Sequence, residues 1–256
     1  MKRKGVFVLA KNRNRYYYYS YSYSKDYAPG DSQAQLKFQV SEAYKTIRTN
    51  LLFSILKSGC KRIVFSSASP GEGKSTVSVN TAISLAQANS RVLLIDCDLR
   101  RPTMHRFFNI PNTPGLTNVL GGLNTLGEAM LDTKYPNLKL LCSGLSVPNP
   151  SEMLASAQLR ELIESLSESF DYIIFDTPPL GVVSDAIPLI KNSDGVVLVV
   201  REMVSTFTDL DKTIGNLQMV DAKILGLVYN GSGTSRANKG GYYHNRYSSY
   251  YYSKKD

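Results

Sequence analysis

Residues 68–75 read Ala-Ser-Pro-Gly-Glu-Gly-Lys-Ser, shortly after the strand-like run Arg-Ile-Val-Phe at 62–65. This spacing is typical of a phosphate-binding loop. Its glycines let backbone N–H groups turn toward phosphate oxygens, its lysine brings charge to the β and γ phosphates, and its last serine offers a hydroxyl to Mg²⁺. A pattern with four free positions also arises by chance, but here a strand precedes it and a helix-like segment, 76–88, follows. The sequence therefore predicts a nucleoside triphosphate site formed by Ser69, Pro70, Gly71, Glu72, Gly73, Lys74, Ser75 and Thr76.

Two further apolar runs end in aspartate. Asp96 follows Val-Leu-Leu-Ile at 92–95, with Asp98 two residues later, and Asp176 follows Tyr-Ile-Ile-Phe at 172–175. Apolar runs without alternation suit parallel strands that are covered by helices on both faces, and ligands collect at the carboxyl ends of such strands. We therefore expect the three carboxylates to converge on the phosphates. For any one of them alone, a helix cap or a solvated strand end is an equally good interpretation.

The remaining segments continue the alternation of strand and helix. The predicted fold class is α/β, a P-loop NTPase with a mostly parallel, doubly wound sheet flanked by helices and with disordered tyrosine-rich tails. A chain of 256 residues is long enough for one such domain. We expect a flexible segment at 1–35, the domain at 36–230 and a tail at 231–256, with further strands at 138–141, 196–200 and 223–228 and helices at 40–57, 151–169 and 205–219.

The formal net charge of +9 lies in the two ends of the chain. Residues 1–30 carry +6 and residues 231–256 carry +4, so the central part has a net charge of −1. A basic patch on the folded surface does not explain the high isoelectric point, and no nucleic-acid partner is expected. Basic ends suit an anionic membrane face, acidic partners or neighbouring subunits, and simple solubilising charge is the alternative.

The tyrosines are distributed in the same way. Seven of the 17 lie in the first 30 residues and six in the last 15. Aromatic residues that pack in a hydrophobic core would not be concentrated at the two ends of the chain. A run that mixes tyrosine with serine is typical of a low-complexity segment. The C-terminal cluster is interpreted as a set of phosphoacceptors, with an aggregation-prone β tail as the alternative. Its members are Tyr242, Tyr243, Tyr247, Tyr250, Tyr251 and Tyr252.

The number and spacing of the cysteines favour a cytoplasmic location for the protein. Cys60, Cys97 and Cys142 are widely spaced, so neither a disulfide framework nor a zinc site is expected. No apolar stretch approaches the roughly 20 residues that a membrane helix needs.

These motifs and the tyrosine-rich tail resemble the bacterial tyrosine kinases of the CpsD/CapB capsule type, the BY-kinases, which are relatives of the ParA/MinD ATPases. The resemblance covers about residues 38–256. ParA/MinD-type ATPases carry a second lysine where this chain has Ser69. Residues 42–48 also resemble the family's oligomerisation motif Glu-x-x-Arg-x-x-Arg, here Glu42, Lys45 and Arg48. Lysine keeps the charge of arginine but loses its planar fork, and an ordinary solvated helix face is the alternative.

The resemblance implies phosphoryl transfer from ATP to tyrosine with Mg²⁺ as the metal. In that mechanism Lys74 stabilises the γ-phosphoryl charge, while Ser75, Asp98 and Asp176 hold the metal directly or through water. Asp96 is the candidate base that accepts the tyrosine proton, and the roles of Asp96 and Asp98 are open to reversal.

The resemblance also implies partners and a location. It implies an Asn side chain at the adenine, here Asn230, and a homo-oligomer, with a ring expected, in which the tail enters a neighbour's site. The family further implies a separate transmembrane activator, a cognate tyrosine phosphatase, control of capsule or exopolysaccharide synthesis, and a peripheral place at the inner face of the cell membrane.

Two other classes of function remain open at this point. One is a positioning ATPase of the ParA/MinD type, against which Ser69 and the terminal tyrosines argue. The other is a nucleotide-dependent scaffold without catalysis, against which the complete set of Lys74 and the three aspartates argues.

Overall fold

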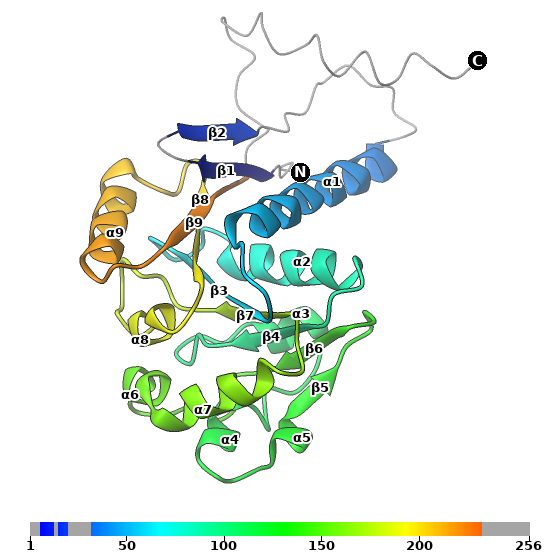
Figure 1. The fold of residues 1–256 in the computed structure, drawn as a ribbon, viewed down its shortest axis with the longest axis vertical. Helices are drawn as coiled ribbons and strands as arrows, with labels where there is room; N and C mark the ends of the chain where they lie inside the picture. Colours follow the sequence, from blue (N-terminus) through cyan, green and yellow to red (C-terminus); the bar gives the residue numbers. More distant parts are fainter. Residues whose placement is uncertain (1–5, 13–14, 20–31, 232–256) are drawn as a thin grey trace, which may run out of the picture.

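The computed structural model describes residues 6–12, 15–19 and 32–231. Nine strands form one sheet in the order β2-β1-β9-β8-β3-β7-β4-β6-β5 (Figure 1). The six strands from β9 to β6 are parallel, while β5, β1 and β2 pair antiparallel at the edges. The strands are β1 Val6–Asn12, β2 Arg15–Tyr19, β3 Lys61–Ser67, β4 Val92–Asp96, β5 Met130–Asp132, β6 Leu138–Leu141, β7 Tyr172–Asp176, β8 Gly195–Arg201 and β9 Ile224–Asn230.

Helices connect the parallel strands, as right-handed crossovers require. They are α1 Ser32–Ser54, α2 Lys74–Ala86, α3 Met104–Phe108, α4 Leu116–Leu120, α5 Leu126–Ala129, α6 Pro150–Ala155, α7 Ala157–Leu166, α8 Ile187–Lys191 and α9 Phe207–Met219. No helix among the described residues combines the length and the apolar character of a membrane span. The predicted α/β fold with a mostly parallel sheet is confirmed.

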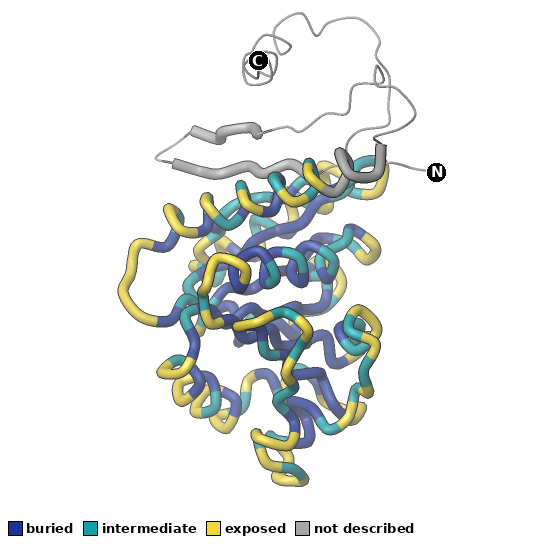
Figure 2. The backbone as a smooth tube through the Cα atoms, turned by 90° about the vertical axis from the view of Figure 1, so that its right-hand side faces the viewer, coloured by how far each residue is buried: buried dark blue, intermediate teal, exposed yellow. Residues whose placement is uncertain are grey.

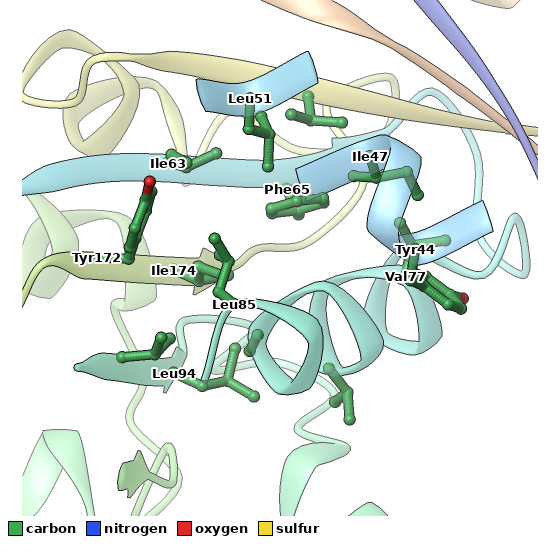
Figure 3. Packing of buried hydrophobic residues seen from close by; sticks show 14 of the residues in the cluster. Tyr44, Ile47, Leu51, Ile63, Phe65, Val77, Leu85, Leu94, Tyr172 and Ile174 are labelled. Atoms are coloured by element: carbon green, nitrogen blue, oxygen red, sulfur yellow. The ribbon is translucent and has the colours of Figure 1, made fainter. Parts of the chain in front are cut away.

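The central strands are buried on both faces, and successive side chains alternate between two cores. In β3, Ile63 and Phe65 join a cluster with α1 and α2, whereas Val64 joins a second cluster with helices α6 to α9. The first cluster is seen in Figure 3, where Ile47 and Leu51 of α1 lie over β3. This two-sided burial is why the central strands contain continuous apolar runs without polar alternation.

Helix α1 begins earlier than the pattern predicts. We expected a helix over 40–57, and the structure gives Ser32–Ser54. The apolar positions on which the prediction relied mark only the packed part of the helix, and the preceding residues are good helix formers without an apolar stripe. Buried and exposed residues then alternate along α1, as the tube in Figure 2 shows for the part whose side chains are described.

The N-terminal segment contains two strands where the sequence predicts a flexible stretch. Strand β1 pairs antiparallel with β9, with Val6 opposite Asn230, and β2 pairs with β1. Tyrosine and valine favour strands, and an otherwise open sheet edge offers them backbone partners. The six C-terminal tyrosines lie outside the described residues.

The helix expected at 151–169 is divided in two. Ser156 has an extended backbone and its side chain accepts a hydrogen bond from the N–H of Leu159, so it starts α7 as an N-cap directly after α6. Serine offers the backbone this alternative to a continuous helix.

We predict that Ile47→Ala, a truncation at the contact between α1 and the sheet, lowers the free energy of unfolding by about 2–5 kcal/mol, as buried large-to-small changes do. Ile47 is 2% exposed and belongs to the first core cluster. Urea unfolding followed by circular dichroism measures the effect. The exposed Thr49→Ala on the same helix is the control, expected within about 0.5 kcal/mol of the parent. Equal midpoints for the two variants would show that α1 does not contribute to the cooperative core.

Candidate nucleotide-binding site

The loop at 68–73 joins the end of β3 to the start of α2, and its glycines are required by the backbone. Gly71 and Gly73 have φ angles of +80° and +93°, which side-chain-bearing residues rarely adopt. A Cβ atom on Gly73 would lie 2.0 Å from the Nδ2 atom of Asn230. The loop therefore ends in a conformation that presents the N-terminus of a 13-residue helix, with its positive dipole end, to a phosphate.

Four predicted site residues, Lys74, Ser75, Asp98 and Asp176, meet beneath this loop. The Nζ atom of Lys74 lies 2.9 Å from Oδ2 of Asp98 and 3.4 Å from Oδ2 of Asp176. Ser75 donates its hydroxyl to the same Asp176 oxygen at 2.6 Å. Ser78, which the motif analysis missed, donates to the other oxygen at 3.3 Å. The expected convergence of the phosphate loop with the ends of β4 and β7 is present.

Asp96 lies beside this cluster and is held differently. Its Oδ2 atom accepts hydrogen bonds from the backbone N–H groups of Thr103 and Met104, and Oδ1 accepts from the N–H of Asp98. The carboxylate is fully buried. It therefore fixes the turn that follows β4 and with it the place of Asp98.

Burial dominates the electrostatics of the site. Desolvation raises the pKa of Asp96 to about 7, and the negative charge of Asp176 acts in the same direction. Desolvation also raises the pKa of Asp176, against the opposing effect of Lys74. Burial alone would lower the pKa of Lys74, but the charges of Asp176 and Asp98 overcome this and raise it. The lysine is therefore cationic and neutralises the carboxylates around it.

The donor atoms suit Mg²⁺. A serine hydroxyl and carboxylate oxygens are hard ligands, and Mg²⁺ is normally held by one or two carboxylates, waters and substrate phosphates. No group of three or more His, Cys, Asp or Glu side chains that could hold a metal occurs in the described part of the chain. Ser75, Asp98 and Asp176 fit an ion that is completed by phosphate oxygens.

The outer side of the loop has supports that the motif does not predict. The Glu72 carboxylate is fully buried, accepts a hydrogen bond from the N–H of Ser69 at 2.8 Å, and accepts one from the hydroxyl of Ser205. Asn230, predicted to contact adenine, donates through Nδ2 to the carbonyl of Glu72 at 2.9 Å. Arg201 donates to the carbonyl of Gly71 at 2.7 Å.

Of the predicted nucleotide contacts, Pro70 is exposed and Thr76 is half-buried on the first turn of α2.

The predicted oligomerisation residues make contacts within the chain. Lys45 pairs with Glu42 at 2.7 Å on the surface of α1. Arg48 donates to the carbonyl of Ser84 in α2 at 2.9 Å, so this guanidinium helps to hold α1 on α2.

A groove of about 620 Å³ lies at the opposite, amino end of the strands and contains none of the predicted site residues. It is lined by residues such as Leu56, Ile190 and Ala222, and a Lys57–Asp194 ion pair of 2.6 Å crosses its lining. The predicted site residues thus gather at the carboxyl ends of the strands and not in this groove.

The fold and this cluster together define a P-loop nucleotide-binding protein. A family model described as "AAA domain" matches residues 60–224. The tyrosine-protein kinase YwqD of Bacillus subtilis is 40% identical over 203 residues, which cover 79% of this chain and 86% of that protein. The tyrosine-protein kinase CpsD of Streptococcus agalactiae is 38% identical over 213 residues, covering 83% and 92%. The chain belongs to this family of bacterial tyrosine-protein kinases, related to CpsD and CapB.

Solved structures agree with the sequence relatives. The kinase domain of the Escherichia coli tyrosine kinase ETK matches with a TM-score of 0.75 and 28% identity, over 85% of each chain. The septum site-determining protein MinD of Pyrococcus horikoshii, solved with Mg-ADP, matches with a TM-score of 0.56 and 27% identity over 66% of this chain and 69% of its own. The kinase likeness extends over more of the chain than the MinD likeness, as expected from the motifs.

We predict that Lys74→Met abolishes nucleotide turnover, with a loss of at least about 100-fold because the charge at the phosphates is removed. The substitution also leaves Asp98 and Asp176 without their cation. A filter assay with labelled ATP and a phosphate-release assay measure binding and turnover. Lys139→Met, which breaks an exposed pair with Asp132, is the control and should leave both unchanged. Undiminished turnover in Lys74→Met would place the nucleotide elsewhere.

Proposed function

We propose that the protein is an ATP-dependent tyrosine kinase that phosphorylates the tyrosine cluster of its own C-terminal tail. The observation that carries this proposal is the cluster of Lys74, Ser75, Asp98 and Asp176 beneath the phosphate loop of a chain that is homologous to tyrosine-protein kinases. Mg²⁺ bound with ATP supplies charge neutralisation at the β and γ phosphates. The residues of the chain supply position and charge.

Lys74 exchanges its carboxylate partners for phosphate oxygens in the proposed mechanism. In the structure its ammonium group is shared between Asp98 and Asp176. Phosphoryl transfer needs little covalent help from a protein, so a cation at the transferred group and aligned reactants do most of the catalysis. Ser75 and Asp176, already 2.6 Å apart, are placed to hold the metal.

Asp98 is the better placed of the two candidate bases. Both oxygens of Asp96 already accept backbone N–H groups, and the side chain is fully enclosed. Asp98 is also buried, but it accepts a single backbone N–H, that of Arg101 at Oδ1, and its Oδ2 is directed at Lys74 in the cluster itself. The raised pKa of Asp96 would suit a base near neutral pH, but geometry comes first, since a base has to touch the proton that it removes. We therefore propose Asp98 as the acceptor of the tyrosine proton and Asp96 as its support.

The charge of the tail supports its role as the substrate. Residues 231–256 carry +4 and six of their positions are tyrosine, whereas the site is lined by carboxylates. A basic segment is attracted to such a site, and each added phosphate contributes about −1.5 to −2 charge, which reverses the attraction. Phosphorylation in trans within a homo-oligomer, with a ring expected, follows from the family's mode of action.

The wider setting is proposed from the relatives. CpsD and CapB are named after capsule loci, so we propose that this kinase regulates capsule or exopolysaccharide synthesis. The chimerical protein CapA2B2, 35% identical with a TM-score of 0.73, is a solved match. We propose a separate transmembrane activator, a peripheral location on the inner membrane face through that activator, and a tyrosine phosphatase that resets the tail. The wider kinase likeness disfavours a positioning ATPase, and the complete cluster disfavours an inert scaffold.

We predict that Asp98→Asn lowers tyrosine phosphorylation by about 10²–10⁴-fold, the usual contribution of a general base, and retains ATP binding. Asp96→Asn replaces a buried acceptor of three backbone N–H groups, so its main effect should be a lower melting temperature. Labelled ATP with phosphosite mapping by mass spectrometry measures transfer, and thermal scans measure stability. If phosphotyrosine is found only outside residues 242–252, the tail is not the acceptor. If Asp98→Asn keeps full activity and a folded Asp96→Asn has none, Asp96 and not Asp98 is the base.

We predict that Glu42→Arg weakens self-association and reduces phosphorylation of the tail in parallel. Like charges placed at a subunit contact cost several kcal/mol, and a tail held by a neighbour loses its high effective concentration in a monomer. The pair with Lys45 is exposed and worth about 0.3–0.5 kcal/mol, so the monomer should remain folded. Sedimentation velocity and a phosphotyrosine assay are compared with Glu161→Arg, an exposed position on α7. Unchanged mass and activity would make this part of α1 an ordinary solvated surface.

A further inference from the structure

The acidic side chain within the phosphate loop points away from solvent and from the catalytic cluster. Glu72 is 0% exposed, although it lies one residue before the N-cap of α2. No cation pairs with it among the described residues, and its oxygens are satisfied by Ser69 and Ser205. A carboxylate so close to a triphosphate weakens anion binding, so its presence has to be explained by what it holds in place.

The hydrogen bonds of Glu72 form one link of a longer chain. The N–H of Arg201, at the end of β8, donates to the hydroxyl oxygen of Ser205 at 2.6 Å, and that hydroxyl donates to Glu72. The other carboxylate oxygen accepts the N–H of Ser69, whose carbonyl accepts the hydroxyl of Ser67 at 2.9 Å. The chain thus runs from the β8–α9 loop, through Glu72, to the first turn of the phosphate loop.

Two more side chains hold the same loop from the same side. Arg201 reaches the carbonyl of Gly71, and Asn230 reaches the carbonyl of Glu72. Arg201 and Asn230 are opposite each other in the parallel pairing of β8 with β9. Consecutive carbonyl groups are therefore turned outward toward these strands, and this leaves the N–H groups free to face the phosphates.

We propose that Glu72 is a positioning residue for phosphoryl transfer, which sets the phosphate loop through Ser205 without touching the nucleotide. The inference rests on the proposed kinase function. Glu72 fixes the distance between the start of the loop and the rigid end of β8, and so fixes where the γ phosphate stands relative to Lys74 and Asp98. Small displacements of reacting groups, of about 1 Å, cost as much as 10²-fold in rate.

The two substitutions of the carboxylate separate charge from position. Glu72→Gln keeps an oxygen for Ser69 but places an amide opposite Ser205 and removes the negative charge. We expect kcat for tail phosphorylation to fall about 10-fold, with KM for ATP unchanged or lower. Glu72→Ala loses both hydrogen bonds, and we expect kcat to fall about 100-fold and KM to rise. A side chain that only stabilised the fold would not produce this split.

Ser205→Ala provides the second arm. It removes the donor to Glu72 and the acceptor of the Arg201 N–H and leaves the carboxylate itself in place, so kcat should fall at least as far as in Glu72→Gln. The double variant Glu72→Gln/Ser205→Ala should be no slower than Ser205→Ala, because the link between Glu72 and Ser205 is already broken in that single variant. Glu161→Gln, an exposed carboxylate on α7, is the matched control and should behave as the parent.

A readout that is independent of kinase activity accompanies the kinetics. Hydrogen exchange followed by mass spectrometry on the full chain should show faster exchange of the Ser69 amide in Glu72→Ala, with peptides of α7 unchanged. If the parent protein fails to phosphorylate tyrosine, the proposed function fails. The exchange data still test whether Glu72 holds the start of the phosphate loop in place. Unchanged exchange at Ser69, unchanged kcat in Glu72→Ala, or additive effects in the double variant would overturn the positioning role. If Glu72→Ala does not fold, Glu72→Gln and Ser205→Ala decide.

Discussion

The buried ammonium group of Lys74 is the constraint on which the site depends. Its side chain is 12% exposed, and a buried charge costs several kcal/mol unless it is paired with good geometry. The partners come from different strands, because Asp98 follows β4 and Asp176 ends β7, while the lysine follows β3. The parallel register that places Asp96 opposite Asp176 therefore decides whether the charges can meet. Fold and site are coupled through this one cation.

The same pairing prepares the site for a nucleotide. A lysine shared by two carboxylates is already desolvated, so in the proposed mechanism phosphate oxygens would replace one set of anions by another without stripping water from the ammonium group. Asp98 and Asp176 would then be available to hold a divalent cation. For this exchange the loop above must keep its shape, and the contacts of Arg201 and Asn230 with its carbonyl groups provide that rigidity.

The sequence predicts those parts of the structure that depend on local pattern. The spacing of 68–75 and the aspartates after apolar runs were sufficient to locate the phosphate loop and the ends of β4 and β7, because glycine, lysine and aspartate have few substitutes there. The partners of the loop could not be found in this way. Ser205 lies 133 residues from Glu72, and a serine after a strand carries no signal until the strand order is known. The three backbone donors to Asp96 could not be found from the sequence for a related reason, since they come together only when the turn after β4 is formed.

Ser69 stands at the position where the sequence pattern of ParA/MinD-type ATPases has a lysine. In this chain the backbone of the position is bound on both sides, because its N–H donates to Glu72 and its carbonyl accepts from Ser67. The first turn of the loop is thereby committed to internal support. These two hydrogen bonds, with those from Arg201 and Asn230 to the carbonyl groups of Gly71 and Glu72, hold the loop by groups of the same chain.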